Sequence, residues 1–472
     1  MKQLLLASLF SAFLIQTASA QNEASAFAAT GRGGAANAFV RDYQSIGINP
    51  ANLGMKHERK VAFGFGELGA GLGSQSLTRS QFGKFITAIE DPITATERTD
   101  IASAFSRKNA MNLNADFTTF GIGVHLGKAG GFAFSNRQRV VANIGLNRNF
   151  AEVLFLGRNA SIYKDPTYQD RVANNEPLLS KAFDGSNLQI AWLNEWNVAY
   201  GKQVLDGDEL KLSVGAGYRY VQGIGALDVS VVDGVFTGYS ALSGVFNVDY
   251  GDRPTKDPNF NYVPEKGSFP FLKAAGTGHG FDVGISAEIK EKLRLGVSVT
   301  DLGSMKWKNN LLQAEDKPLQ IINSEGIETY NIFGEAADIV GSDGLLTYQS
   351  GGERTVSLPT RLRFGAGYMA SDKLEIGADF SLPFNKVAAN LPAPFVGLGV
   401  GYKLAKVVHL NTGISAGAGY GLNIPLGVVF DLGVYELGFG TRSVNGWFSE
   451  KNPYSSVAFG MLRFKIGKMQ EE

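Results

Sequence analysis

Residues that could carry out chemistry are few and scattered along this chain of 472 residues. It contains no Cys, which excludes a Cys nucleophile, a Cys-based zinc site and a disulfide framework. No Ser nucleophile elbow occurs, and carboxylates show no local catalytic pairing. The four histidines lack the spacing of metal ligands: His57, His125, His279 and His409. We therefore expect neither an enzyme nor a bound metal or cofactor.

One motif matches a nucleotide-binding pattern. Residues 64–69 read Gly-Phe-Gly-Glu-Leu-Gly and fit G-x-G-x-x-G. A dinucleotide site needs this motif between a strand and a helix, within a βαβ unit. The residues around it alternate with a period of two, so the motif is expected within a β-structure without a nucleotide.

The composition narrows the class of protein further. The chain has 44 basic and 44 acidic residues and therefore no net basic charge for binding nucleic acid. Hydrophobic residues make up 44% of the chain, which argues against disorder. The 59 glycines are the most unusual feature, since 15 prolines are too few for a collagen-like or Pro/Gly low-complexity chain.

The first 20 residues have the features of a signal peptide. Lys2 precedes an apolar run from Leu4 to Ile15, and Ala18-Ser19-Ala20 forms an A-x-A cleavage site. The alternative is a short membrane anchor, but a helix of about 12 apolar residues does not span a hydrocarbon core of ~30 Å. We expect cleavage before Gln21 and export. No later segment offers about 18 consecutive apolar residues, which excludes a helical inner-membrane protein.

Apolar residues then alternate with small or polar residues in one segment after another. In residues 281–289, for example, Phe281, Val283 and Ile285 alternate with Asp282 and Gly284. This period of two predicts half-buried β-strands, and repeated segments of about 10 residues are typical of transmembrane barrels. We place strands at 58–73, 111–127, 131–147, 190–204, 210–235, 278–290, 293–304, 358–370, 373–383, 394–404, 408–418, 422–431, 434–443 and 455–467.

Connection lengths support a barrel independently. Every second connection is short, whereas the long ones (about 74–110, 148–189, 236–277 and 305–357) all belong to the other set. Outer-membrane barrels have short turns on one rim and long loops on the other. We therefore predict an all-β fold: an antiparallel transmembrane β-barrel of about 14 strands, residues 58–472, in the Gram-negative outer membrane. A soluble all-β protein is the alternative. Trp192, Trp196 and Trp307 are expected at the outer membrane interface, or else in an ordinary core.

The face opposite the aliphatic residues would line the lumen. Many glycines fall on that face, among them Gly215, Gly284 and Gly365, and glycine in a strand often marks close approach of another backbone. Charged residues of both signs fall there too, including Arg137, Glu195 and Arg219. We interpret these as contacts to a plug; a solvated wall is the alternative for the charges.

Residues 21–57 are the candidate plug, since they precede the first strand and lack its alternation. Gly31-Arg32-Gly33-Gly34-Ala35-Ala36-Asn37-Ala38, followed by Asn49-Pro50-Ala51, resembles the N-terminal hatch of FadL-type long-chain fatty-acid transporters. Residues 298–303 and 358–365 resemble a related branch of poorly characterised FadL-like barrels. The resemblance implies a 14-stranded barrel whose N-terminal hatch plugs the lumen. The last residues depart from many outer-membrane barrels, which end in an aromatic residue.

The third predicted strand contains an irregularity. Asn136 and Gln138 share the parity of Phe132, Phe134 and Val140, so the regular pattern would point two polar side chains toward lipid. We expect a bulge or kink near residues 135–138, because such exposure is costly. In FadL-type proteins a kink in this strand opens a lateral exit; a plain register bulge is the alternative.

Two apolar groups lie in predicted outer loops. Phe82, Phe85, Ile86 and Ile89 have helical spacing, and the second group comprises Phe260, Tyr262, Phe269 and Phe271. Exposed apolar patches mark ligand or protein interfaces, and loops packing on one another are the alternative.

Two functions follow from this interpretation. The first is a FadL-like plugged barrel that passes hydrophobic small molecules such as fatty acids, with movement at Asn49-Pro50 releasing the ligand. The second is an accessory barrel that binds protein partners in outer-membrane secretion or assembly. Expected partners are membrane lipid and lipopolysaccharide, a hydrophobic ligand and, for the second function, other outer-membrane proteins.

Overall fold

The structure is a computed structural model that describes residues 26–74, 77–88, 90–105, 110–167, 174, 176–331, 335–336, 339, 345–387, 390–391, 393–418, 421–450 and 454–468. The predicted signal peptide lies outside these residues.

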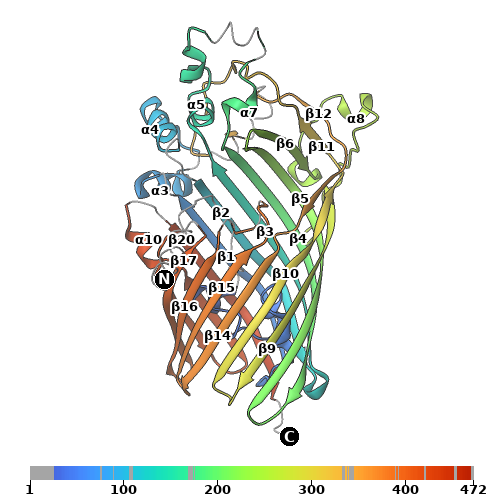
Figure 1. The fold of residues 1–472 in the computed structure, drawn as a ribbon, viewed down its shortest axis with the longest axis vertical. Helices are drawn as coiled ribbons and strands as arrows, with labels where there is room; N and C mark the ends of the chain where they lie inside the picture. The colour runs from blue at the N-terminus through green and yellow to red at the C-terminus, as the bar shows by residue number, and fades with distance from the viewer. Residues whose placement is uncertain are drawn as a thin grey trace, which may run out of the picture.

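Fourteen strands close into one antiparallel barrel, which confirms the predicted fold class (Figure 1). β1 pairs with both β2 and β20, and this double pairing closes the cylinder. The barrel strands are β1 (Arg59–Ser74), β2 (Ala110–His125), β3 (Gly131–Gly145), β4 (Asn187–Asp206), β5 (Leu210–Val232), β9 (Gly276–Ile289), β10 (Leu293–Trp307), β14 (Arg361–Ser371), β15 (Leu374–Pro383), β16 (Phe395–Ala405), β17 (Val408–Gly417), β18 (Leu426–Asp431), β19 (Tyr435–Thr441) and β20 (Tyr454–Lys468).

The strand pattern places an apolar belt outside and small or polar residues inside. Phe281, Ile285 and Leu398 point outward and are 52–53% exposed. Arg219 and Asp282, which alternate with outward residues, are buried in the lumen. An outward apolar band around a polar interior is typical of barrels that span a membrane. In the part of the chain that is described, no helix has the length and apolar character needed to cross a bilayer.

One rim carries short turns and the other carries long loops, as expected. On the short-turn rim, residues 432–434 join β18 to β19; Gly433 has φ +85° and donates its N–H to Asp431. The opposite rim, here called the loop rim, carries the elements of the long connections, several of which rise above the barrel at the top of Figure 1. They are α3 (Arg79–Thr87), α4 (Ala95–Phe105), α5 (Arg148–Leu156), α7 (Leu179–Ala182), β6 (Val235–Leu242), α8 (Arg253–Lys256), β7 (Gly267–Ser268), β8 (Phe271–Leu272), β11 (Leu311–Ala314), β12 (Tyr348–Ser350), β13 (Arg354–Ser357) and α10 (Val444–Phe448).

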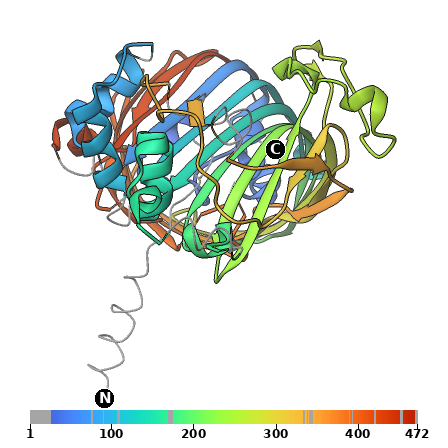
Figure 2. The same cartoon turned by 90° about the horizontal axis from the view of Figure 1, so that it is seen from above.

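The loop elements extend the wall and cover part of the opening (Figure 2). β6 continues the sheet beside β5 and pairs with β11, while β13 pairs with the upper end of β10. Buried apolar side chains from several loops form one core above the barrel. In it the Phe150 and Phe183 rings stack at 4.3 Å between centroids, and those of Phe105 and Phe155 at 5.4 Å.

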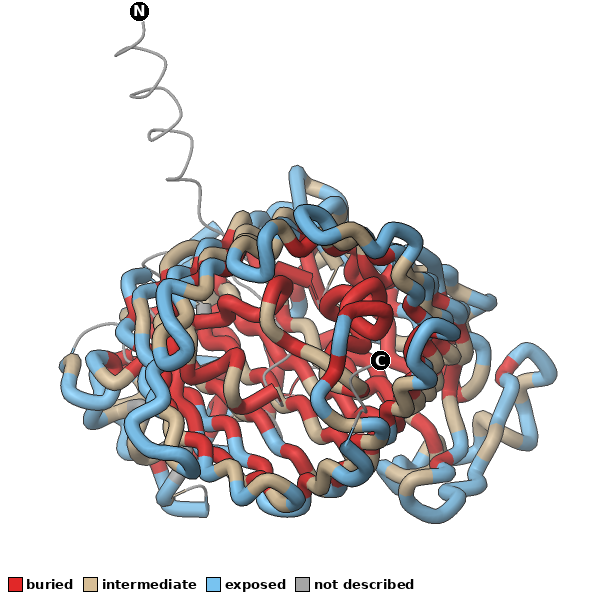
Figure 3. Tube along the Cα trace, turned by 90° about the horizontal axis from the view of Figure 1, so that it is seen from below, coloured by how far each residue is buried: buried red, intermediate tan, exposed pale blue. Residues whose placement is uncertain are grey.

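The segment before β1 folds inside the barrel. It contains the short helix α2 (Phe27–Gly31) and two 3₁₀ turns, η2 (Asp42–Ser45) and η3 (Pro50–Gly54). Seen from the short-turn rim, this segment is mostly buried within the wall (Figure 3). We call residues 26–57 the hatch; the predicted N-terminal plug is confirmed for this described part.

Candidate functional site

The hatch lies so close to the wall that the wall needs glycine. A Cβ built on Gly31 of the hatch would lie 2.8 Å from the Cα of Gly427 in β18. A Cβ on Gly399 would lie 2.7 Å from the Arg32 carbonyl oxygen, and one on Gly296 would lie 2.6 Å from the side-chain oxygen of Asn37. Real Cβ atoms do not approach other atoms this closely. The glycine-rich inner wall therefore fits the hatch, as the sequence predicted.

Three asparagines form the centre of the hatch. Asn49 donates from Nδ2 to Asn37 Oδ1 at 2.8 Å and to Ser286 Oγ of β9 at 3.0 Å. Asn52 donates to the carbonyl oxygens of Asn37 and Val40, at 2.7 and 2.9 Å. All three asparagines are buried. The predicted Asn49-Pro50-Ala51 motif thus lies at the hatch–wall contact, with Pro50 packed on Gly215 of β5.

Charged contacts attach the hatch to several sides of the barrel. Asp379 of β15 accepts the backbone N–H groups of Ala36 and Asn37, at 3.0 and 2.8 Å. Arg463 of β20 pairs with Asp42 at 2.7 Å, and Arg32 pairs with Glu375 of β15 at 3.0 Å. These polar contacts add to apolar packing between the hatch and the wall, such as that of Phe27 against Val429 and Ala458.

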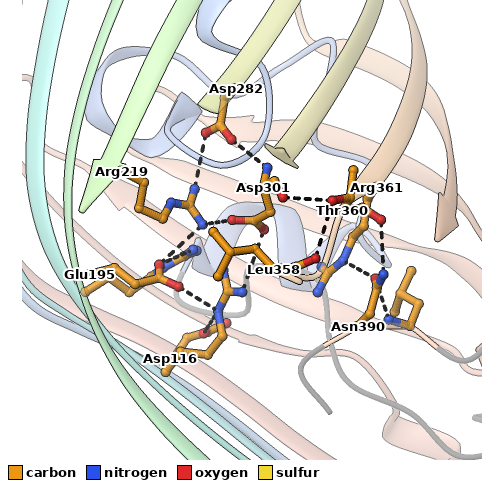
Figure 4. A network of polar contacts seen from close by, with 12 residues as sticks. Asp116, Glu195, Arg219, Asp282, Asp301, Leu358, Thr360, Arg361 and Asn390 are labelled. Carbon is orange, nitrogen blue, oxygen red and sulfur yellow. Dashed lines mark hydrogen bonds and ion pairs between the residues drawn. The ribbon is translucent and has the colours of Figure 1, made fainter. Parts of the chain in front are cut away.

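A second set of buried charges crosses the lumen on the loop-rim side of the hatch (Figure 4). Arg137 donates to Glu195 at 2.7 and 3.0 Å. Arg219 is 1% exposed and pairs with Glu195 at 3.4 Å, with Asp282 at 3.2 Å and with Asp301. We call this group the ion-pair lattice; its members are Asp116, Arg137, Arg139, Glu195, Arg219, Asp282 and Asp301.

The ion-pair lattice bears on one interpretation of the sequence. We expected lumen charges such as Arg137, Glu195 and Arg219 to contact the plug. Among the described residues they pair with one another across β2, β3, β4, β5, β9 and β10, six neighbouring strands. A charge buried in a lumen must be paired, and the wall itself supplies these partners. Contact of these three charges with the plug stays a prediction.

Asn136 and Gln138 do face outward, and an irregularity lies at the predicted level of the wall, but on β2 rather than within β3. β3 pairs with β4 without interruption, whereas the β2–β3 register shifts between Thr118 and Phe120 of β2. The outward amides are buried: Asn136 and Gln138 both donate to Asn194 Oδ1 of β4, at 2.6 and 2.7 Å. Trp192 donates its indole N–H to Gln138 at 2.9 Å. We call Asn136, Gln138, Asn194 and Gln222 the amide patch.

A hairpin from a loop covers the amide patch on the outside of the wall. We call residues 266–273 the strap; it contains β7 and β8. The Pro270 carbonyl oxygen accepts from Asn194 at 2.8 Å, Phe271 stacks on Trp196 at 5.1 Å, and Phe269 lies 6.3 Å from the Phe117 ring. Phe271 remains 69% exposed. Polar groups on a lipid-facing wall must be bonded within the protein, and the strap helps to meet that requirement.

The structure divides the second predicted loop patch into two parts. Phe269 and Phe271 belong to the strap, whereas Phe260 is buried against Tyr250, 5.0 Å between ring centroids, with Tyr262 beside it. In the first patch, helix α3 forms where the spacing predicted it and includes Phe82, Phe85 and Ile86; their side chains are not described. Ile89 lies outside the described residues.

Trp307 follows the alternative interpretation, an ordinary core. We placed Trp192, Trp196 and Trp307 at the membrane interface. Trp192 and Trp196 do lie on the outer face beside the strap, but Trp307 is only 2% exposed and packs inward in a small core with Met305 and Leu358. β10 shifts register between Val299 and Leu302, which reverses the expected facing of the residues that follow.

The remaining motifs form no chemical site. The Gly64–Gly69 motif lies within β1, with no helix directly after it. The rings of His57 and His125 meet at 4.6 Å, but no group of three or more metal-ligating residues occurs among the residues described. On the loop rim, the hydrogen bond from Lys84, then that from Thr94, holds the pKa of Glu97 at about 2.

A family model described as a family of unknown function, DUF5723, matches residues 50–441. The chain belongs to this family. The match runs from Pro50 of the Asn-Pro-Ala motif to the end of β19, so in this DUF5723 protein it covers thirteen of the fourteen barrel strands, the amide patch, the strap and the ion-pair lattice. A search of curated proteins gave no match.

Solved structures similar to this DUF5723 chain include two transporters and one FadL homologue. The toluene transporter TbuX of Ralstonia pickettii is 13% identical, with 93% of this chain and 97% of that chain covered and a TM-score of 0.44. The toluene transporter TodX of Pseudomonas putida is 10% identical, with 96% and 100% covered and a TM-score of 0.44. A Pseudomonas aeruginosa FadL homologue is 12% identical, with 95% and 99% covered and a TM-score of 0.43.

Two parts of the site were missed in the sequence. Asp116 and Asp301 of the ion-pair lattice were not singled out, although Asn112, Asn114 and Asp116 share a face in β2 and signal a polar interior. The strap was seen only as apolar loop residues. The strap could have been inferred from Asn194 and Gln222. These polar residues lie on the outward faces of β4 and β5, so another part of the chain must cover the wall there.

Proposed function

We propose that this protein is a plugged barrel of the Gram-negative outer membrane that passes hydrophobic small molecules, and that they leave sideways through the wall beneath the strap. The short-turn rim would face the periplasm and the loop rim the cell exterior, as in other outer-membrane barrels. The signal peptide predicted at residues 1–20 supports this location.

The observation that carries the proposal is the amide patch on the lipid-facing wall. Four polar side chains occupy positions where lipid would otherwise require apolar ones, and a loop hairpin seals them. The β2–β3 register shift lies directly beside them, at Thr118 to Phe120. A polar, loop-sealed region next to a break in the ladder is the part of this wall best suited to open.

The contents of the lumen favour exit of the ligand through the wall over passage along the whole lumen. The ion-pair lattice and the hatch both lie between the loop rim and the short-turn rim, and both consist of buried polar contacts. An apolar ligand would have to displace these bonds to cross the whole lumen, at a cost of ~1–3 kcal/mol for each buried group left unsatisfied. Leaving through the wall avoids the hatch.

Uptake measurements test this function. A deletion strain should take up radiolabelled palmitate or toluene more slowly than the wild type, and the plasmid-borne gene should restore the rate. A variant carrying Phe269→Ser and Phe271→Ser loosens the strap and should change the rate, whereas Leu422→Ser and Phe448→Ser, exposed residues elsewhere on the loop rim, should not. Equal uptake in the wild-type and deletion strains would reject the transport function.

The ion-pair lattice also favours a second candidate, an accessory barrel that binds other outer-membrane proteins. Ion pairs that link six neighbouring strands make the barrel wall rigid. A rigid barrel can bind a partner protein on its surface without opening its lumen. Affinity purification in mild detergent tests this. A stoichiometric partner protein, together with unaltered uptake in the deletion strain, would favour this second function.

A further inference from the structure

A large cavity lies beneath the hatch at the short-turn rim. It measures about 820 Å³ and is bounded by hatch residues and by the ends of strands such as β1, β9, β16 and β20. Cavities of ~300–1,000 Å³ are the size of ligand sites in proteins. We call it the vestibule. No part of the proposed lateral route uses it, because that route leaves the barrel on the far side of the hatch.

The vestibule has a surplus of positive charge. Part of its lining is internally paired: Arg32 with Glu375, Arg294 with Glu288, and Lys465 with Glu436. Five further basic residues have no ion pair within the described ranges, 26–74 to 454–468: Lys56, Arg59, Lys60, Lys403 and Lys468. Glu58 is the acidic lining residue without an ion pair in those same ranges.

The spacing of these cations indicates what kind of anion fits. Arg59 and Lys468 are register partners on β1 and β20, whereas Lys403 lies on β16, four strands away from β20. At ~4.8 Å between strands, the two groups are about 19 Å apart around the wall. One carboxylate or phosphate cannot reach both. An extended peptide rises ~3.3 Å per residue, so about six residues would span the gap.

We propose that the vestibule binds an acidic, extended segment of a periplasmic protein. This inference rests on the proposed orientation, in which the short-turn rim faces the periplasm. Half-buried Phe39 and Met369 in the lining would accept an apolar side chain between the acidic ones. The bound segment would touch the hatch itself, because Lys56 is a hatch residue. The Lys56 carbonyl oxygen accepts a hydrogen bond from Arg41, another hatch residue.

Fluorescence anisotropy with a labelled hexaglutamate peptide tests the site on the full barrel folded in detergent. At low ionic strength we expect hexaglutamate to bind and hexaserine not to bind. The triple variant Lys60→Ser, Lys403→Ser and Lys468→Ser should weaken binding at least tenfold. The control variant Lys290→Ser, Lys292→Ser and Lys406→Ser removes the same charge from turns on the same rim and should leave the affinity unchanged.

Three results would overturn the proposal. They are equal binding of hexaserine, equal weakening in both triple variants, and complete displacement of hexaglutamate by citrate at an equal concentration of carboxylate groups, which would indicate a small-anion site. Binding is measured on purified protein and uptake in cells, so failure here leaves the transport proposal untouched, and the reverse also holds.

Discussion

Asn49 and Asn37 of the hatch are joined by a hydrogen bond from Nδ2 to Oδ1 at 2.8 Å, and both side chains also reach the barrel wall. Asn49 donates to Ser286 of β9, and Asn37 donates to the Gly296 carbonyl oxygen of β10 at 3.2 Å. One pair of amides therefore closes the hatch on itself and fastens it to two neighbouring strands.

Replacing Asn49 with Ala should loosen the hatch. The substitution removes the side-chain partner of Asn37 Oδ1 and that of the Ala51 N–H, both buried, at ~1–3 kcal/mol for each group. We expect larger ion currents through single barrels in planar bilayers and faster protease cleavage within residues 26–57. Asn259→Ala, in an exposed loop, is the matched control; identical currents for the two variants would argue against the role of Asn49.

Gly215 and Gly217 test the fit between the hatch and the wall. Both lie on the inner face of β5, but a Cβ on Gly215 would overlap the Pro50–Ala51 backbone, whereas one on Gly217 has its nearest neighbour at 3.4 Å. Gly215→Ala should destabilise the hatched state by ~1–3 kcal/mol through overpacking. Gly217→Ala should be close to wild type in the same protease assay. Resistance of both variants to cleavage would show that the hatch does not need this contact.

Arg219 should be essential for stability because it is shared by three buried carboxylates. Arg219→Met leaves Glu195, Asp282 and Asp301 undercompensated, and breaking a buried pair costs ~3–5 kcal/mol. Lys306→Met removes an exposed pair with Glu353 and should cost less than ~1 kcal/mol. Denaturant unfolding in detergent, followed by tryptophan fluorescence, measures both. A similar midpoint for the two variants would contradict a structural role for the ion-pair lattice.

The contact between α3 and α4 should weaken in acid. Hydrogen bonds from Lys84 and Thr94 hold the pKa of Glu97 at about 2, below its usual ~4.3. A lowered carboxyl pKa stabilises the folded loop above the ordinary pKa, and this stabilisation is lost as the pH falls from about 4 to 2. Hydrogen exchange of residues 79–105 should therefore quicken from pH 5 to pH 3 beyond the intrinsic change. The Glu97→Gln variant should lack that extra acceleration; the same acceleration in the variant would exclude Glu97 as its cause.

The strands could be predicted because their signal is local. Alternation along each strand is set by whether a side chain meets lipid or lumen, and both environments act on every second residue. The hatch was predicted in the same way, from the absence of alternation before Arg59 and from the Asn49-Pro50-Ala51 motif. Because the glycines of the barrel strands fall on one face, the sequence also predicted that the inner wall fits closely around the hatch.

The site was predicted less well because its contacts are distant in sequence. Asn136 breaks the alternation of β3, and a bulge or kink is the explanation that the neighbouring residues alone suggest. The protein instead covers the amide patch with Pro270, a residue more than 130 positions later. Nothing near Asn136 encodes that cover. The partners in the ion-pair lattice were unpredictable for the same reason, since register between strands decides which charges meet.

A cross-link across the β2–β3 ladder tests lateral exit most directly. Ile122 and Phe134 are register partners on this ladder close to the β2 shift, and the chain contains no Cys of its own. The control pair, Leu398 and Ile414, are register partners on β16 and β17, and both are exposed. In the Ile122→Cys, Phe134→Cys variant, oxidation should stop uptake of labelled palmitate or toluene and reduction should restore it, while the Leu398→Cys, Ile414→Cys variant transports in both states. Undiminished uptake through the oxidised β2–β3 barrel would contradict the lateral route.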